Sequence, residues 1–124
     1  MKYLLAFLIV AGGIFFFLQN GSTKELVQYA ELEQKIAAQA DFILLDVRTP
    51  EEYQEGHIPG AVLLPYDKIA IQAAVVLPDK EKEIIVYCRS GRRSAIAAET
   101  LGKLGYMKVA DFGGISRWQG QLEK

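Results

Sequence analysis

The 124-residue chain contains only one cysteine and one histidine, and both scarcities restrict its chemistry. An internal disulfide is excluded because it needs two thiols. A closed metal site needs about four ligands, most often cysteine and histidine, so we expect no bound metal, and we expect no cofactor. A large excess of charge is also missing, since the formal net charge is −1. Nothing therefore favours nucleic acid as a partner, and any preference for anions must be local.

Charge is absent from residues 3–18, YLLAFLIVAGGIFFFL, which follow Met1 and Lys2. At about 1.5 Å per residue, a helix of this segment would be roughly 24 Å long, slightly shorter than the ~30 Å hydrocarbon core of a membrane. Residues 1–19 are therefore expected to be a signal peptide or a membrane anchor, and the lack of an A-x-A cleavage site favours the anchor. A buried core helix is disfavoured because the segment has no polar stripe.

With Lys2 on the cytoplasmic side, the rest of the chain would be exported. We expect it in the periplasm or on the extracytoplasmic face of the inner membrane. Residues 20–27 are predicted to be a linker, and residues 28–124 a single folded domain.

Beyond the linker, the hydrophobic pattern alternates between helix and strand spacing. Thr49, Pro50 and Glu52 form the signature of a helix start, with a capping box. The alternation predicts an α/β domain with a parallel sheet, whose strands end in polar residues at one shared edge. Helices are expected at residues 26–39, 50–55, 66–77 and 94–104 and around Trp118, strands at residues 42–47, 61–65, 84–87 and 108–112, and polar strand ends at Asp46, Cys88 and Asp111.

The segment VYCRSGRRSA, residues 86–95, surrounds the only thiol with positive charge. Cys88 lies between a strand and a helix expected to begin near Ser94, where free N–H groups and the helix dipole favour an anion. Gly91 lets those N–H groups converge, and three arginines add fixed charge. These features favour a nucleophilic thiolate and an anionic substrate over the alternative of an inert buried thiol.

Three blocks of the sequence resemble a single-domain rhodanese, a thiosulfate-type sulfurtransferase, over residues 29–122. The motif D-x-R matches residues 46–48, and G-H-I-x-G-A matches residues 56–61. The catalytic loop C-x-x-G-x-R matches residues 88–93, and G-G-x-x-x-W matches residues 113–118. Related phosphatases have C-x5-R, which would require arginine at the position of Ser94, so phosphatase activity is not expected.

The resemblance implies a parallel five-stranded sheet flanked by helices and a reaction in two steps. Cys88 would take the outer sulfur of a donor such as thiosulfate, and a thiol or cyanide would remove it from the resulting persulfide. Arg92 and Arg93 would hold the sulfonate of the donor. The backbone N–H groups that would hold the persulfide belong to Arg89, Ser90, Gly91, Arg92, Arg93 and Ser94.

Several alternatives stay open at this point. Asp46 and Arg48 could contact substrate or brace a loop with a buried salt bridge. His57 could pair with Cys88 as in cysteine proteases, although a structural role in its turn is favoured. Trp118 is expected to seal the core. The alternative function is a membrane-tethered sulfur carrier or protein-docking module with little turnover.

Overall fold

A computed structural model describes residues 25–124. The expected signal peptide or anchor at residues 1–19 lies outside the described residues, as does most of the expected linker. No helix within the described part is long and apolar enough to cross a membrane.

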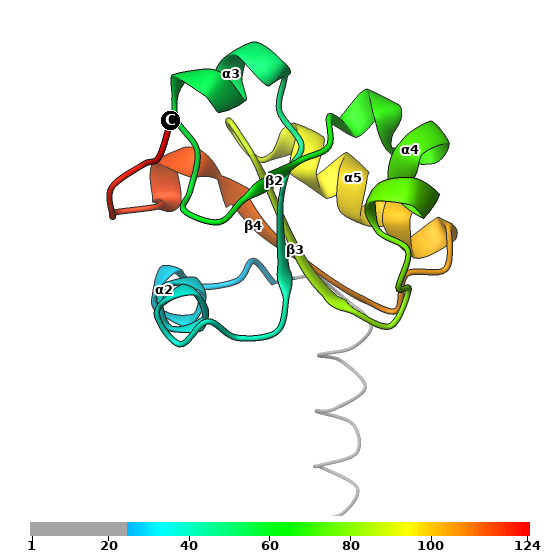
Figure 1. Cartoon of the computed structure of the whole chain (residues 1–124), viewed down its shortest axis with the longest axis horizontal. Coiled ribbons are helices and arrows are strands. Elements are labelled where there is room, and N and C mark those ends of the chain that lie inside the picture. Colours follow the sequence, from blue (N-terminus) through cyan, green and yellow to red (C-terminus); the bar gives the residue numbers. More distant parts are fainter. Residues whose placement is uncertain (1–24) are drawn as a thin grey trace, which may run out of the picture.

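Helices and strands alternate along the described chain, which confirms the predicted α/β class (Figure 1). The elements are α2 (Tyr29–Ala37), β1 (Ile43–Asp46), α3 (Pro50–Glu55), β2 (Val62–Leu63), the 3-10 helix η1 (Tyr66–Lys68), α4 (Ile69–Val76), β3 (Glu83–Cys88), α5 (Arg92–Lys103), β4 (Lys108–Gly114) and the 3-10 helix η2 (Ile115–Arg117).

The sheet is parallel throughout, with the strand order β2-β1-β3-β4. Its four strands are those that the hydrophobic pattern predicts. The fifth strand, which only the resemblance implied, is wrong for residues 25–124. At the outer edge of β4, the N–H of Val27 donates a hydrogen bond to the carbonyl of Asp111 at 2.8 Å. This segment makes no ladder with β4, so it does not count as a strand.

Val27, at the end of the predicted linker, packs against the folded domain. Its side chain is buried in the core, and its carbonyl accepts a hydrogen bond from Arg117 at 3.1 Å. The last residue of the predicted linker at residues 20–27 is therefore held against the domain by burial and by two hydrogen bonds.

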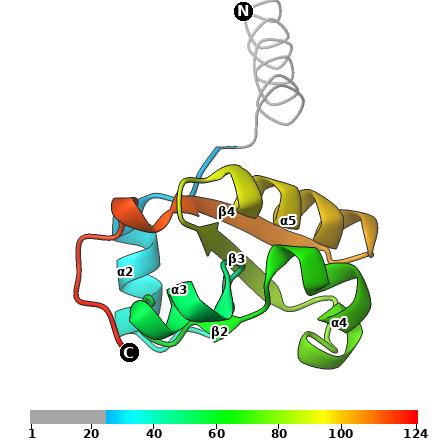
Figure 2. The same ribbon diagram turned by 90° about the horizontal axis from the view of Figure 1, so that it is seen from above.

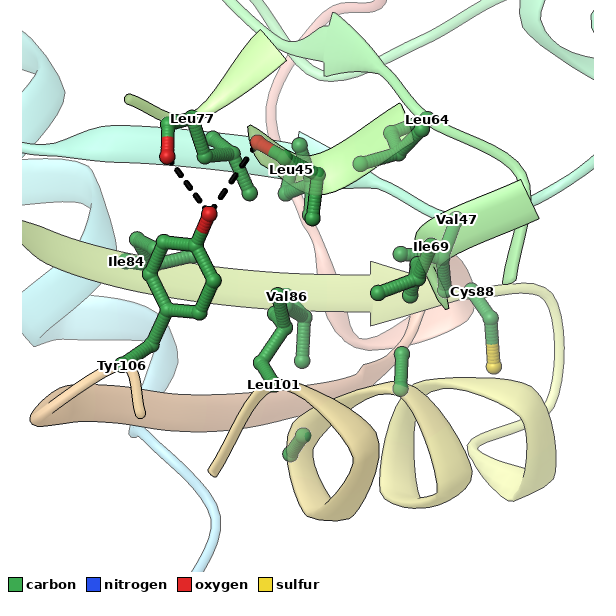
Figure 3. Close-up of a cluster of buried hydrophobic side chains, with 13 residues drawn as sticks. Leu45, Val47, Leu64, Ile69, Leu77, Ile84, Val86, Cys88, Leu101 and Tyr106 are labelled. Atoms are coloured by element: carbon green, nitrogen blue, oxygen red, sulfur yellow. Dashed lines mark hydrogen bonds between the residues drawn. The ribbon is translucent and has the colours of Figure 1, made fainter. Parts of the chain in front are cut away.

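Helices cover both faces of the sheet (Figures 1 and 2). On one face, α4 and α5 pack over β1 and β3 around Leu45, Val86 and Leu101, as Figure 3 shows. The Tyr106 hydroxyl lies 3.0 and 2.5 Å from two carbonyls of α4 and its carboxyl end, those of Ala73 and Leu77. On the other face, α2 packs around Leu32, Leu44, Ile85 and Phe112.

The predicted capping box at the start of α3 is confirmed. The N–H of Glu52 donates to the Thr49 hydroxyl at 3.2 Å, and the Glu52 carboxylate accepts the N–H of Thr49 at 3.0 Å. Pro50 occupies the first position of the helix.

Several other element boundaries also differ from the predicted ones, and the helix expected at residues 26–39 is the shorter α2, Tyr29–Ala37. The helix expected at residues 66–77 is divided into η1 and α4, and the helix expected from residue 94 begins two residues earlier, at Arg92. The helix expected around Trp118 is the short turn η2. β4 continues past Phe112 to Gly114, so the end of this strand lies beside the loop that follows Cys88.

Candidate active site

Cys88 ends the central strand β3 and is fully buried. Its sulfur points toward the start of α5 (Figure 3). The N–H of Gly91 donates a hydrogen bond to Sγ at 2.9 Å, and the Ser94 hydroxyl oxygen lies 3.4 Å from Sγ. The thiol is thus enclosed by its own loop and the first turn of α5.

The loop reaches this geometry through Gly91, which caps α5 in the left-handed region with φ +106°. A side chain is strained in this conformation, so glycine is required. N–H groups in the first turn of a helix have no acceptor inside the helix, and the helix dipole places partial positive charge there. The sulfur therefore lies where a thiolate and the negative charge of a bound anion are both stabilised.

The end of β4 lies against the same loop. Cys88 is aligned with Gly114 in the sheet, and an ideal Cβ on Gly114 would be 2.6 Å from the carbonyl oxygen of Arg89. Only glycine permits so close an approach. Asp111, expected at the strand end, is instead aligned with Val86, so it does not share the edge with Cys88.

The three arginines of the loop lie in different environments. Arg89 and Arg92 are exposed. Arg93 forms a two-pronged ion pair with the Glu52 carboxylate, with nitrogen–oxygen distances of 2.8 and 3.0 Å. Hydrogen bonds from Arg93 lower the pKa of Glu52 to about 2, with further contributions from Thr49. Arg93, predicted to hold the donor, therefore has its charge opposed by a carboxylate of α3.

Asp46 and Arg48 form a buried ion pair below the site, with side chains 0% and 6% exposed. Arg48 contacts both carboxylate oxygens of Asp46 at 2.7–3.1 Å, and it also donates to the carbonyl of Gly56 at 2.7 Å. The Tyr87 hydroxyl donates to Asp46 at 2.8 Å and accepts the N–H of Ile58 at 3.0 Å. This arrangement braces the turn at residues 56–58, and neither charged side chain is presented to solvent.

The Tyr87 hydroxyl remains protonated in this network. Burial raises the pKa of Tyr87 far above its ordinary value, and the negative charge of Asp46 raises it further. Tyr87 therefore keeps the proton that it donates to Asp46 at neutral pH. Nothing in the local sequence around Tyr87 indicates these partners, which lie 29 and 41 residues away.

His57 lies in the braced turn and contacts Tyr53. The two rings stack with centroids 3.8 Å apart, and Nδ1 is 2.9 Å from the Tyr53 carbonyl oxygen. Nε2 lies 3.8 Å from the carboxylate of Glu123. Within residues 25–124, the hydrogen-bond partners of the Cys88 sulfur are Gly91 and Ser94, so His57 does not form a dyad with the thiol.

Other side chains considered from the sequence lie away from the sulfur. Trp118 is half-buried and packs edge-on against Tyr29 of α2, with ring centroids 5.2 Å apart. Among the described residues, no cluster of three or more histidine, cysteine, aspartate or glutamate side chains could hold a metal ion.

Two residues of the site escaped the sequence analysis. Glu52 was recognised only as part of the capping box, and its pairing with Arg93 joins positions 41 residues apart. Gly114 was recognised only as part of a motif, and its contact with Arg89 depends on the register of β4. Neither contact can be predicted from the local sequence pattern.

A family model described as "Rhodanese-like domain" matches residues 28–121. The chain belongs to the rhodanese-like family. Its relatives include the thiosulfate sulfurtransferase PspE of Escherichia coli (strain K12), 41% identical over 71 residues that cover 57% of this chain and 68% of PspE. A protein named sulfurtransferase from Allochromatium vinosum is 40% identical over 88 residues, which cover 70% of this chain and 80% of that one.

A solved structure described as a rhodanese with anions from E. coli superposes with a TM-score of 0.62 at 36% identity, covering 66% of this chain and 96% of that one. The likeness extends to the sequence, so more than the fold is shared. Relatives named as sulfurtransferases support a role in sulfur transfer for this rhodanese-like protein.

Proposed function

We propose that this rhodanese-like protein is a sulfurtransferase that takes the outer sulfur of thiosulfate onto Cys88 and passes it to a thiol. The observation that carries the proposal is the enclosure of Sγ, with the N–H of Gly91 at 2.9 Å, at the start of a twelve-residue helix beside two exposed arginines. A nucleophile with no adjacent base suits a donor whose leaving group needs no proton.

In the first step, the Cys88 thiolate attacks the outer sulfur of thiosulfate. A new S–S bond forms, the S–S bond of thiosulfate breaks, and sulfite leaves with the electron pair. In the second step, a thiolate or cyanide attacks the outer sulfur of the cysteine persulfide and restores the Cys88 thiolate. No external oxidant or reductant is needed, because sulfur and its charge are only exchanged.

Arg89 and Arg92 are exposed, and neither forms an ion pair within residues 25–124, so both can attract the thiosulfate dianion. The first-turn N–H groups of α5 would hold the outer sulfur of the persulfide, which is where negative charge collects after the first step. Ser94 is fully buried, so its hydroxyl acts on Sγ rather than on the donor.

Full burial of Cys88 favours a second candidate, a sulfur carrier or protein-docking module with little turnover. A buried sulfur can meet a donor only when the side chains or loop around it move. The two candidates differ in the rate of sulfur transfer, which is substantial for a sulfurtransferase and low for the second candidate. A docking module would also bind its partner with or without Cys88.

Thiocyanate formation from thiosulfate and cyanide tests the proposal. A sulfurtransferase gives parallel lines in double-reciprocal plots, because sulfite leaves before cyanide binds, and Cys88→Ser abolishes turnover. Cys88→Ala is a second variant that lacks the sulfur atom, and both variants should keep the fold. Turnover that survives either substitution would contradict the proposal.

Export of the domain is also a proposal, supported by the uncharged segment at residues 3–18. Fractionation of cells that express the full chain should place it with the inner membrane, accessible to protease from the periplasmic side. Recovery from the cytoplasmic fraction would contradict export.

A further inference from the structure

The pairing of Glu52 with Arg93 joins α3 to the catalytic loop. α3 lies at the same end of the sheet as the start of α5 (Figure 1). The Glu52 carboxylate receives two hydrogen bonds from the Arg93 guanidinium, at 2.8 and 3.0 Å, and both side chains are about one-fifth exposed or less. Such a planar two-pronged pair holds both groups in one geometry.

Glu52 is itself fixed by the capping box. One of its oxygens lies 3.0 Å from the N–H of Thr49 and 3.1 Å from the Thr49 hydroxyl, while it also accepts Arg93. A carboxylate with this many donors cannot easily swing away from the arginine. The Glu52–Arg93 pair therefore contributes little net charge beside the Cys88 loop, although the sequence of the loop contains three arginines.

We propose that Glu52 is a specificity-determining residue that sets the charge of the donor site. It cancels the charge of Arg93 and leaves the attraction of anions to Arg89 and Arg92. This inference rests on the proposed function for its substrate class, a small sulfur anion. Its consequence is that removing the Glu52 charge strengthens anion binding, whereas loss of a merely structural contact would weaken it.

Glu52→Gln tests this consequence, because glutamine keeps the size and the capping acceptor but lacks the charge. Glu51→Gln is the matched control, since Glu51 is the exposed neighbour in the same turn of α3 and its loss changes the net charge equally. The probe is inorganic sulfate, measured by how well it protects Cys88 of the full chain from alkylation by the neutral reagent iodoacetamide.

We expect Glu52→Gln to tighten sulfate protection about three- to tenfold, as one uncompensated charge several ångströms from an anion would do. Its thiosulfate KM should fall by a similar factor, and Glu51→Gln should change either value less than about twofold. Unchanged or weaker sulfate protection in folded Glu52→Gln would overturn the inference.

The double variant Glu52→Gln with Arg93→Gln separates charge balance from direct contact. If Glu52 cancels Arg93, neutralising both returns sulfate protection to within about twofold of the original protein. If Arg93 itself held the anion, the double variant would lose protection, and the inference would fail. Sulfate protection requires no turnover. If no persulfide formed, the proposed function would fail, but the sulfate protection of these variants would still decide the role of Glu52.

Discussion

At the scale of single residues, the chemistry of Cys88 depends on what surrounds its sulfur. The N–H of Gly91 and the hydroxyl of Ser94 are its partners, and both belong to the turn that begins α5. Sequence reasoning proposed Cys88 as the nucleophile and assigned the turn of the loop to Gly91 from the loop composition. It assigned Ser94 only to the backbone cradle, because burial of its side chain depends on how α5 packs on the sheet.

Ser94→Ala tests the role of the hydroxyl beside the sulfur. The Ser94 hydroxyl also lies 3.1 Å from the Gly91 carbonyl oxygen, so it bonds both the sulfur and the loop. The Cys88 thiol donates to the hydroxyl oxygen, and the hydroxyl donates its one proton to the Gly91 carbonyl, so the hydroxyl has to turn toward the sulfur once Cys88 is ionised. Ser94→Ala removes that donor, and we expect persulfide formation to slow about three- to tenfold, the effect of roughly one hydrogen bond.

Stopped-flow alkylation and persulfide formation at one fixed pH measure this effect. Ser116→Ala is a matched control, because Ser116 is an exposed serine on η2. An alkylation rate of Ser94→Ala identical to that of the original protein would show that the hydroxyl has no influence on the sulfur.

At the scale of elements, the site depends on three segments that meet at one end of the sheet: the catalytic loop, α3 and the end of β4. The sequence predicted the loop and the start of α3, since helix caps and glycine turns are local signals. It did not predict that Arg93 reaches Glu52, or that β4 continues to Gly114. Such contacts depend on strand register and helix packing, which residue patterns specify only loosely.

Gly114→Ala tests the close approach of β4 to the loop. The added methyl group would lie 2.6 Å from the Arg89 carbonyl oxygen, so the loop must shift. We expect a loss of about 1–3 kcal/mol in the free energy of unfolding, as for other overpacked sites, and at least a tenfold slower sulfur transfer.

Gly102→Ala provides the opposite case. Gly102 lies within α5, and a Cβ there meets nothing within 4 Å. Alanine should stabilise the helix by about 0.5–1 kcal/mol with sulfur transfer unchanged. Urea unfolding and turnover measured on both variants check the pair, and equal effects of the two substitutions would contradict the close approach.

The link between α3 and the loop should also appear in the pH dependence of stability. Arg93 lowers the pKa of Glu52 to about 2, against an ordinary value of 4.5. A lowered folded pKa contributes stability above the ordinary value, and that contribution is lost as the pH falls toward 2. Glu52→Gln should therefore cost about 1–2 kcal/mol at neutral pH, discounted for partial exposure, and progressively less below pH ~4.5.

Urea unfolding of the original protein, Glu52→Gln and Glu51→Gln between pH 3 and pH 7 measures this window. The difference between the original protein and Glu52→Gln should shrink with acid, while Glu51→Gln shows no such trend. A difference that stays constant over this range would mean that the ion pair does not stabilise the fold.

At the scale of the whole molecule, the α/β class and the parallel sheet were predictable because strands and helices alternate in the sequence. The four observed strands followed from apolar runs, whereas a fifth came only from the resemblance and is wrong for residues 25–124. The buried brace of Asp46, Arg48 and Tyr87 links two neighbouring strands to the turn at residues 56–58. From the sequence, substrate contact and loop bracing were both open for the first two of these residues.

The proposed function requires that Cys88 carry a sulfur atom taken from thiosulfate. Its most direct test is the intact mass of the protein before thiosulfate, after thiosulfate, and after subsequent cyanide. Thiosulfate should add the mass of one sulfur atom, which cyanide removes and which Cys88→Ser does not gain. No gain with thiosulfate, or a gain that persists in Cys88→Ser, would contradict it.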